Sequence, residues 1–215
     1  MDNPVEIEKR FYVLEDLKDF LVSKKFTSSK VISDEYLDTP DGLFYQDGIY
    51  IRVRNGKSLD FKFNPEHLGS HNVEYGASCH EYNIELPFES STISIIETLQ
   101  KIISIKCPHP YTFEEFLRAN NLQSLMVLQK IRDIYEDETF IVAVDKFSDL
   151  GTFVEFEAKK FMSSDSFFKE LVAITKGLHL KPLNSGYFEL RLREINESLY
   201  LKGKYLIDEE EKVVA

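Results

Sequence analysis

Glu6-Ile7-Glu8-Lys9-Arg10, close to the start of the chain, carries charged residues at every second position of a segment typical of a β-strand. Alternate residues of a strand share one face of the sheet. Glu6, Glu8 and Arg10 are therefore expected on one side, with Ile7 and its apolar neighbours on the other. A single charged strand face is usually only the solvated side of a sheet. This stretch becomes evidence for a functional site only because the same pattern recurs on other strands.

The same pattern recurs on five later segments of the chain. They are Arg52-Val53-Arg54, Asp60-Phe61-Lys62, Glu81-Tyr82-Asn83-Ile84-Glu85, Lys130-Ile131-Arg132 and Glu155-Phe156-Glu157-Ala158-Lys159. Some of these strands carry paired acids and others carry paired bases. Guanidinium groups hold phosphate oxygens bidentately, and Mg²⁺ or Mn²⁺ prefers carboxylates, waters and phosphate oxygens. The distribution thus suits a site that binds a polyanion together with a divalent metal.

The amino-acid composition of the chain argues against some classes of function. The chain has 215 residues, of which 43% are hydrophobic, and its 17 Phe and 11 Tyr indicate a globular protein. A net charge of −11 argues against a nucleic acid or an anionic membrane as the main partner. A local cluster of Arg and Lys can still bind a small anion within an acidic protein.

The two cysteines, Cys79 and Cys107, are far apart and form no CxxC motif. They are interpreted as buried thiols in a reducing compartment rather than as zinc ligands together with His80 and His109. The sequence shows no run of apolar residues as long as a membrane span and no signal-peptide core. These features predict a cytoplasmic protein.

Strand patterns dominate and come in adjacent pairs. Strands are expected at 4–13, 28–38, 48–54, 58–64, 80–88, 126–136, 139–147 and 152–160, and helices at 14–25, 92–105, 112–121, 164–177 and 187–200. No repeat or flexible linker divides them. The pattern predicts a single α+β domain over residues 1–202, built on an antiparallel sheet, followed by an acidic and frayed tail over 203–215.

Turn lengths decide whether the charged faces coincide, because a shift of one residue reverses a strand's faces. A two-residue turn at Asn55-Gly56 would put the arginines and Lys62 on opposite faces. A three-residue loop that includes Lys57 places Arg52 opposite Asp60 and keeps Lys62 on the same face. The three-residue loop is the prediction.

Two further turns bear on the later strands. A three-residue loop at Asp149-Leu150-Gly151 would place Asp145 opposite Glu155, with Glu157 on the same face. A two-residue turn at Asp137-Glu138 would set Lys130 opposite Asp145. For any one charged pair, a solvated surface is the more ordinary interpretation. For six strands together that interpretation weakens, because the opposite faces are as apolar as a core and outer helices would cover them.

These segments resemble, in order and over nearly the whole chain, those of the CYTH superfamily, the triphosphate tunnel metalloenzymes. That group includes thiamine triphosphatases, inorganic triphosphatases and class IV adenylyl cyclases. The resemblance rests on Glu6 to Arg10, Tyr36-Leu37-Asp38-Thr39-Pro40, Ile49 to Arg54, Phe61-Lys62, Glu81, Lys130-Ile131-Arg132, Val144-Asp145 and Leu150 to Glu157. It implies an eight-stranded antiparallel closed β-barrel, a tunnel with charged residues inside and helices at its periphery.

The resemblance also implies roles for individual residues. Glu6, Glu8 and Glu157 correspond to ligands of one divalent metal, Mg²⁺ or Mn²⁺, and Asp145 and Glu155 to contributors to a second metal or its water. The triphosphate clamp and substrate contacts correspond to Arg10, Arg52, Arg54, Lys62, Lys130 and Arg132, with Glu81 as a further acid of the tunnel.

Three positions need separate treatment. Arg10 stands where the family usually has lysine, and arginine binds phosphate but cannot serve as a base. The family's late lysine is missing from Leu183 to Tyr187, which leaves open whether Lys181 replaces it. Tyr50 stands where animal thiamine triphosphatases carry Trp; its ring would either stack on a cationic thiazolium or merely pack at the tunnel mouth.

The function expected from the resemblance is metal-dependent hydrolysis of a small triphosphate, either thiamine triphosphate or inorganic triphosphate. A class IV adenylyl cyclase acting on ATP and a non-catalytic polyphosphate-binding module are the alternatives. The expected partner is the triphosphate itself, with no nucleic acid and no membrane, and the chain is expected to be a monomer or homodimer.

Overall fold

A computed structural model describes residues 7–69, 79–107 and 111–206. Within these residues the chain forms two compact units. The first unit consists of 33–128 and 187–206, and the second of 7–32 and 129–186. The prediction of one domain over 1–202 stays a prediction. Glu6, one of the proposed metal ligands, lies outside the described residues.

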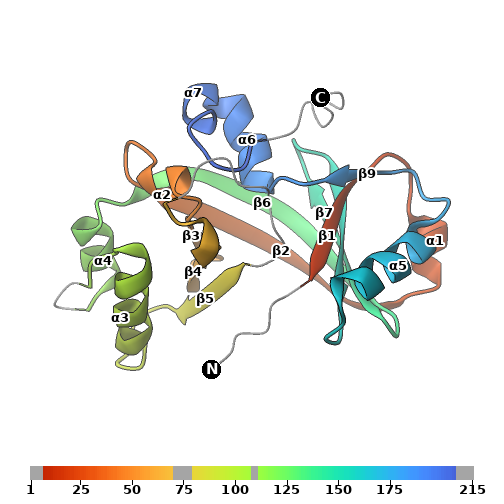
Figure 1. Cartoon of the computed structure of the whole chain (residues 1–215), viewed down its shortest axis with the longest axis horizontal. Helices are drawn as coiled ribbons and strands as arrows, with labels where there is room; N and C mark the ends of the chain where they lie inside the picture. Colours follow the sequence, from red (N-terminus) through yellow and green to blue (C-terminus); the bar gives the residue numbers. More distant parts are fainter. Residues whose placement is uncertain (1–6, 70–78, 108–110, 207–215) are drawn as a thin grey trace. The chain divides into compact units, whose positions relative to one another are not determined.

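The strands and helices are distributed along the chain as Figure 1 shows. The strands are β1 (Glu8–Val13), β2 (Lys25–Asp38), β3 (Tyr50–Arg54), β4 (Ser58–Phe63), β5 (His80–Glu85), β6 (Gln123–Glu136), β7 (Phe140–Phe147), β8 (Thr152–Ala158) and β9 (Leu180–Leu183). The helices are α1 (Lys18–Val22), α2 (Leu43–Gln46), η1 (Pro65–His67), α3 (Thr92–Ile103), α4 (Phe113–Ala119), α5 (Ser164–Thr175), α6 (Tyr187–Ile195) and α7 (Glu197–Tyr200).

The strands belong to one sheet, whose hydrogen-bonded order is β5-β4-β3-β2-β6-β7-β8-β1-β9. The pairs β1–β8, β1–β9, β2–β3, β3–β4, β4–β5, β6–β7 and β7–β8 are antiparallel. The predicted α+β architecture on an antiparallel sheet is confirmed, with nine strands rather than eight. The additional strand, β9, is only four residues long and contains Pro182, which hides its strand pattern.

The hairpin of the first unit has the predicted register. Arg52 pairs with Asp60 and Arg54 with Ser58, so the loop between them has three residues. Asn55 and Gly56 adopt φ values of 54° and 65°, and these left-handed conformations suit Asn and Gly. Arg52 and Lys62 therefore lie on the same face of the sheet.

The two registers predicted for the second unit are wrong by two residues each. Asp145 pairs with Phe153 instead of Glu155, because the loop closes at Phe147 and Gly151. Arg132 instead of Lys130 pairs with Asp145. The turn before β7 lies one residue later than predicted, since the Asp137 N–H donates to the Phe140 carbonyl oxygen at 3.1 Å and leaves Glu138 and Thr139 between them. A shift of two residues preserves the face, so the charged side chains still gather on one side.

The other face of the sheet in the first unit is apolar and is covered by α3 and α4. The core there comprises Leu37, Ile49, Ile51, Val53, Leu59, Phe61, Phe63, Ile84, Ile96, Leu99, Ile103, Ile105, Phe116 and Leu122. Phe61 meets Phe116 edge-to-face with ring centroids 6.1 Å apart. The strands contribute every second residue to this core, and the helices contribute residues at helical spacing.

The second unit repeats this arrangement with α5 and the segment around α1. Its core comprises Phe11, Leu17, Phe140, Val142, Val144, Val154, Phe156, Phe167 and Leu171. Phe140 contacts both Phe156 and Phe167 through edge-to-face ring pairs. In each unit, burial of the apolar face directs the alternate residues, and with them the charges, to the opposite face.

The last described residues, up to 206, are packed against the first unit, and the acidic tail over 203–215 stays a prediction. The Lys204 ammonium donates to the backbone oxygens of Asp47 at 2.9 Å and His67 at 2.6 Å. A Cβ on Gly203 would lie 2.1 Å from the Tyr45 hydroxyl oxygen, so only glycine fits there. Among the described helices, none has both the length and the apolar character needed to cross a membrane.

Truncation of a core ring tests the packing of the first unit. Phe116 is fully buried, so Phe116→Ala is expected to lower the free energy of unfolding by about 3–5 kcal/mol. Phe161→Ala is the control, because Phe161 is 98% exposed and should cost about 0.5 kcal/mol or less. Urea denaturation followed by circular dichroism measures both, and equal losses would contradict the assigned core.

Candidate functional site

The polar face of the first unit gathers charged side chains from four neighbouring strands. Arg52 and Arg54 come from β3, Asp60 from β4, Asp34 from β2 and Glu81 from β5. Register places them together, since Asp34 pairs with Arg54 and Asp60 with Arg52. Lys62 pairs with both Tyr50 and Glu81 and shares this face.

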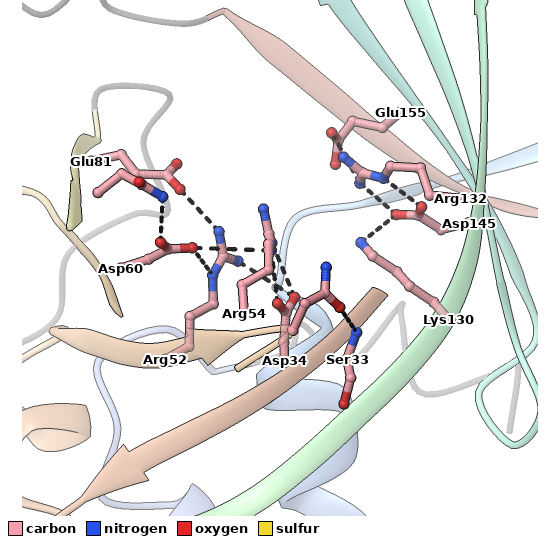
Figure 2. A network of polar contacts seen from close by, with 12 residues as sticks. Ser33, Asp34, Arg52, Arg54, Asp60, Glu81, Lys130, Arg132, Asp145 and Glu155 are labelled. Atoms are coloured by element: carbon pink, nitrogen blue, oxygen red, sulfur yellow. Dashed lines mark hydrogen bonds and ion pairs between the residues drawn. The ribbon is translucent and has the colours of Figure 1, made fainter. Parts of the chain in front are cut away.

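Arg52 lies at the centre of this group and contacts three acids (Figure 2). Its Nε donates to Asp60 Oδ2 at 3.0 Å and its Nη2 donates to Glu81 Oε1 at 2.9 Å. Its Nη1 is 3.8 Å from Asp34 Oδ2. Burial opposes the charge on Arg52, yet the neighbouring Tyr36 and the acids raise its pKa, so the guanidinium stays protonated.

Arg54 forms a bidentate ion pair with Asp34. Its Nε and Nη2 donate to the two carboxylate oxygens at 2.8 and 3.0 Å. Asp60 is only 1% exposed and also accepts from the Asn83 amide at 2.6 Å. The acids Asp34 and Asp60 were not assigned to the site from the sequence. Their positions alternate with core residues, which is the signal that could have identified them.

The second unit holds a separate cluster centred on Asp145, which is fully buried. Arg132 donates from Nε to Oδ1 at 2.6 Å and from Nη2 to Oδ2 at 2.5 Å. The Lys130 ammonium donates to the same Oδ2 at 2.8 Å. Figure 2 shows both bases directed at this one carboxylate. One acid thus balances two basic side chains that would otherwise repel each other.

Glu155 and Arg10 extend this cluster onto β8 and β1. Arg10 donates from Nε and Nη2 to Glu155 Oε2 at 2.9 and 2.6 Å. Arg132 Nη2 also reaches Glu155 Oε1 at 3.4 Å. Arg10 and Glu155 are direct cross-strand partners, which accounts for the short contacts. Arg10 therefore belongs to the polar face, as predicted from the alternation in β1.

The ionisation of this cluster follows from burial and charge. Burial alone would raise the pKa of Glu155, but Arg10, Arg132 and Lys130 hold it well below its ordinary range. The pKa of Asp145 is likewise lowered, because Arg132 and Lys130 outweigh its burial. Burial first, and the nearby Arg132 second, lower the pKa of Lys130 to about 8. Both acids are ionised at neutral pH.

Two further carboxylates of the second unit face each other across β1 and β8. Glu8 pairs directly with Glu157, next to the Arg10–Glu155 pair. Like charges directly opposite each other are unfavourable in a sheet, and a bound cation relieves their repulsion. Arg10 Nη2 approaches Glu8 Oε1 at 3.5 Å. Oxygen donors in this pairing fit Mg²⁺ or Mn²⁺.

The described residues give only part of the expected metal site. Within residues 7–69, 79–107 and 111–206, His, Cys, Asp and Glu side chains form no group of three or more able to hold a metal. Of the three carboxylates assigned to the first metal, Glu8 and Glu157 are brought together and Glu6 lies outside the described residues. Asp145 and Glu155, assigned to a second metal, are bound by guanidinium groups in this structure.

Comparison with known proteins identifies the family. The sequence model of the CYTH domain family matches residues 5–188 of this chain. The chain belongs to the CYTH domain family. A search of curated proteins found no match.

Solved structures with the CYTH fold confirm the architecture. A putative adenylate cyclase from Vibrio parahaemolyticus is 18% identical with a TM-score of 0.56, and the match covers 88% of this chain and 99% of that one. A putative adenylyl cyclase from Hippeastrum, described as having a dominant triphosphatase activity, is 16% identical with a TM-score of 0.56, covering 88% and 95%. The PH1819 protein from Pyrococcus horikoshii is 18% identical with a TM-score of 0.53, covering 88% and 99%.

Tyr50, a predicted site residue, contacts residues that the sequence analysis did not assign to the site. Its hydroxyl donates a short hydrogen bond to the carboxylate of Glu189 on α6. Its ring stacks on Tyr205 with centroids 6.4 Å apart and meets Phe188 edge-to-face. Glu189 and Tyr205 were not assigned to the site, because helix and tail residues gave no strand pattern to follow.

Lys181, considered as a replacement for the family's late lysine, lies on β9. It pairs with Tyr12, while Arg10 pairs with Leu183. Since paired residues share a face, Lys181 is on the face of β9 that corresponds to the polar face of β1. Its role as a substitute stays a prediction.

The Glu155 ion pairs predict a specific response to acid. The lowered pKa means that Glu155 stabilises the fold fully above its ordinary value of 4.5 and loses this contribution as the pH falls through the folded-state pKa. Glu155→Gln removes that titration, so its unfolding free energy should decline less between pH 5 and pH 2 than that of the wild type. Denaturant titrations at each pH measure the difference.

The exposed Glu138 provides the control for this experiment. Glu138→Gln should follow the wild-type pH curve. Parallel curves for Glu155→Gln and the wild type would contradict the ion-pair assignment.

Proposed function

We propose that this CYTH protein is a divalent-metal-dependent triphosphatase acting on a small triphosphate. The observation that carries the proposal is the direct pairing of Glu8 with Glu157 beside Arg10 and Glu155. A carboxylate pair that favours a cation adjoins bases that favour phosphate. A metal–triphosphate complex presents both kinds of charge together. One ligand would therefore satisfy both the carboxylate pair and the neighbouring bases.

The arginines supply the phosphate-binding groups of the proposal. Arg52, Arg54, Arg132 and Arg10 each engage carboxylates in this structure. The phosphate oxygens of a triphosphate match the guanidinium fork as well as these carboxylates do. Binding would therefore exchange one set of charge-assisted hydrogen bonds for another. The exchange keeps the guanidinium groups paired with anionic oxygens in both states.

Glu8 and Glu157 are the described residues that would hold the metal. The metal, when bound, would supply Lewis-acid activation of a phosphoryl group and of water. Each unit offers its own bases for the negative charge that develops on phosphoryl oxygens: Arg52 in the first unit, and Arg132 and Lys130 in the second. Arg10 binds and orients phosphate but cannot accept a proton. Lys62 adds a further positive charge on the face shared with Arg52.

Thiamine triphosphate and inorganic triphosphate are the proposed substrates. Adenylyl cyclase activity is the alternative suggested by the names of similar structures, and both reactions require a clamp and a metal. Purified protein should be incubated with each triphosphate and with ATP, in Mg²⁺ or Mn²⁺, and the products separated. Release of inorganic phosphate supports the triphosphatase. Cyclic AMP with pyrophosphate supports the cyclase, and tight binding without turnover supports a polyphosphate-binding module.

Substitution of Arg52 by lysine is the best test of its proposed role in holding the triphosphate. Alanine would leave the buried Asp60 without its charged partner and destabilise the fold. Arg52→Lys retains the charge but loses the fork, and kcat/KM should fall by about 100-fold. Arg118→Lys is the matched control, because Arg118 is exposed and pairs only locally. Equal activity of the two variants would refute the clamp.

The carboxylate pair predicts the response to metal. Activity should vanish with excess chelator and return on addition of Mg²⁺ or Mn²⁺. Glu157→Gln removes one charge at nearly constant shape, so the metal concentration for half-maximal activity should rise about tenfold or more. Metal titrations of initial rates measure it, with the exposed Glu170→Gln as control. Undiminished hydrolysis in excess chelator would overturn the metal assignment.

A further inference from the structure

Asp145 and Glu155 correspond to contributors to a second metal in the CYTH pattern, but their carboxylates are covered. The side chain of Asp145 is 0% exposed and that of Glu155 is 7% exposed. In the neighbouring carboxylate pair of Glu8 and Glu157, the side chain of Glu8 is 21% exposed. A hydrated metal ion can therefore reach this pair more readily than it can reach Asp145 or Glu155.

The oxygens of Asp145 are already used by basic side chains. Arg132 donates to Oδ1 at 2.6 Å and to Oδ2 at 2.5 Å, and the Lys130 ammonium donates to Oδ2 at 2.8 Å. A carboxylate has about four lone-pair sites, and these three hydrogen bonds occupy most of them. Oδ2 accepts two hydrogen bonds, which leaves it no lone pair for a metal.

Glu155 is occupied in the same way. Arg10 donates from Nε and Nη2 to Glu155 Oε2 at 2.9 and 2.6 Å, and Arg132 Nη2 donates to Oε1 at 3.4 Å. Figure 2 shows the Arg132 guanidinium next to the carboxylates of both Glu155 and Asp145. One arginine thus links the two acids that a second metal would have to bind.

The charge of this group of side chains also opposes a further cation. Three bases contact its two acids, so positive charge is in excess before any metal binds; these bases, called the base cluster below, are Arg10, Lys130 and Arg132. A divalent ion bound at Asp145 would lie beside Lys130 and Arg132. Like charges repel strongly in a buried site, because the effective dielectric constant there is low.

The facing carboxylates of β1 and β8 have different surroundings. Glu8 and Glu157 are direct cross-strand partners, and the Arg10 that approaches Glu8 at 3.5 Å is shared with Glu155. A cation relieves the repulsion between facing carboxylates. The described residues of the second unit therefore offer one position that favours a metal ion and one that opposes it.

We propose that Asp145 and Glu155 are anchors that hold the base cluster rather than ligands of a second metal, so that the chain binds one divalent ion. The base cluster supplies the positive charge that a second ion provides in a two-metal site. Asp145 and Glu155 are positioning residues, since they act through the bases that they hold. The inference rests on the proposed function for the metal at Glu8 and Glu157.

The number of bound ions is the first measurement. Mn²⁺ is titrated into the protein alone and into the protein with one equivalent of imidotriphosphate, a triphosphate analogue that resists hydrolysis. Calorimetry and electron paramagnetic resonance follow its binding. We expect one Mn²⁺ per chain, bound about tenfold or more weakly by Glu157→Gln and with unchanged affinity by Asp145→Asn. A second ion that is lost in Asp145→Asn would overturn the inference.

A second variant covers the case in which Asp145→Asn fails to fold, because it leaves buried bases with one acid fewer. The double variant Lys130→Met with Asp145→Asn removes one base together with one acid. It should bind Mn²⁺ as the wild type does. It should bind imidotriphosphate about tenfold more weakly than Lys130→Met alone, because Arg132 has lost its anchor. Equal affinities of these two variants for imidotriphosphate would contradict the anchor role.

Asp165→Asn is the matched control, since Asp165 is an exposed acid on α5 of the same unit. It should keep the wild-type affinities for Mn²⁺ and imidotriphosphate. Thermal unfolding midpoints of all variants separate changes in binding from changes in stability.

These binding measurements also separate failure of the inference from failure of the proposed function. A wild type that hydrolyses no triphosphate, yet binds one Mn²⁺ that Glu157→Gln weakens and Asp145→Asn does not, retains the inference and refutes the triphosphatase. A wild type that hydrolyses triphosphate with two bound ions, one of which is lost in Asp145→Asn, retains the triphosphatase and refutes the inference.

Discussion

The alternation of side chains along each strand organises both units of this protein. Because helices bury the apolar faces of both units, every intervening residue of β1, β3, β4, β7 and β8 is directed to the opposite face. That face carries arginines, lysines and carboxylates that are themselves partly or fully buried. Its charges must therefore compensate one another, as Asp145 does for Lys130 and Arg132.

Such compensation is a costly way to stabilise a fold, since desolvation offsets much of the attraction between buried charges. A polar face of this kind agrees with the ligand-binding role proposed for it above. Carboxylates such as Asp34, Asp60 and Glu155 keep the guanidinium groups ionised and oriented in the absence of a ligand. In the proposed function they would also hold the guanidinium groups in the fork geometry that phosphate requires, so that less reorganisation would remain for binding.

Several features of the fold and site could be predicted because they follow from period-two patterns. The faces of Arg10, Arg52, Lys62, Asp145 and Glu157 were predictable even where the register was not. The errors at the two later turns were of two residues, and such errors move partners along a strand without changing faces. The position of a turn depends on local hydrogen bonds such as that from the Asp137 N–H to the Phe140 carbonyl oxygen, which a pattern of polar residues does not determine.

Sequence patterns were enough to predict the strand faces, the helices that cover them and membership in the CYTH family, because hydrophobic periodicity and short motifs are local properties. Three features became apparent only in three dimensions: the pairing of Asp34 with Arg54, the ninth strand, and the packing of Glu189 and Tyr205 against Tyr50. Tyr50 and Tyr205 are more than 150 residues apart in the chain. Contacts of that kind arise from burial and chain topology, which no local pattern encodes.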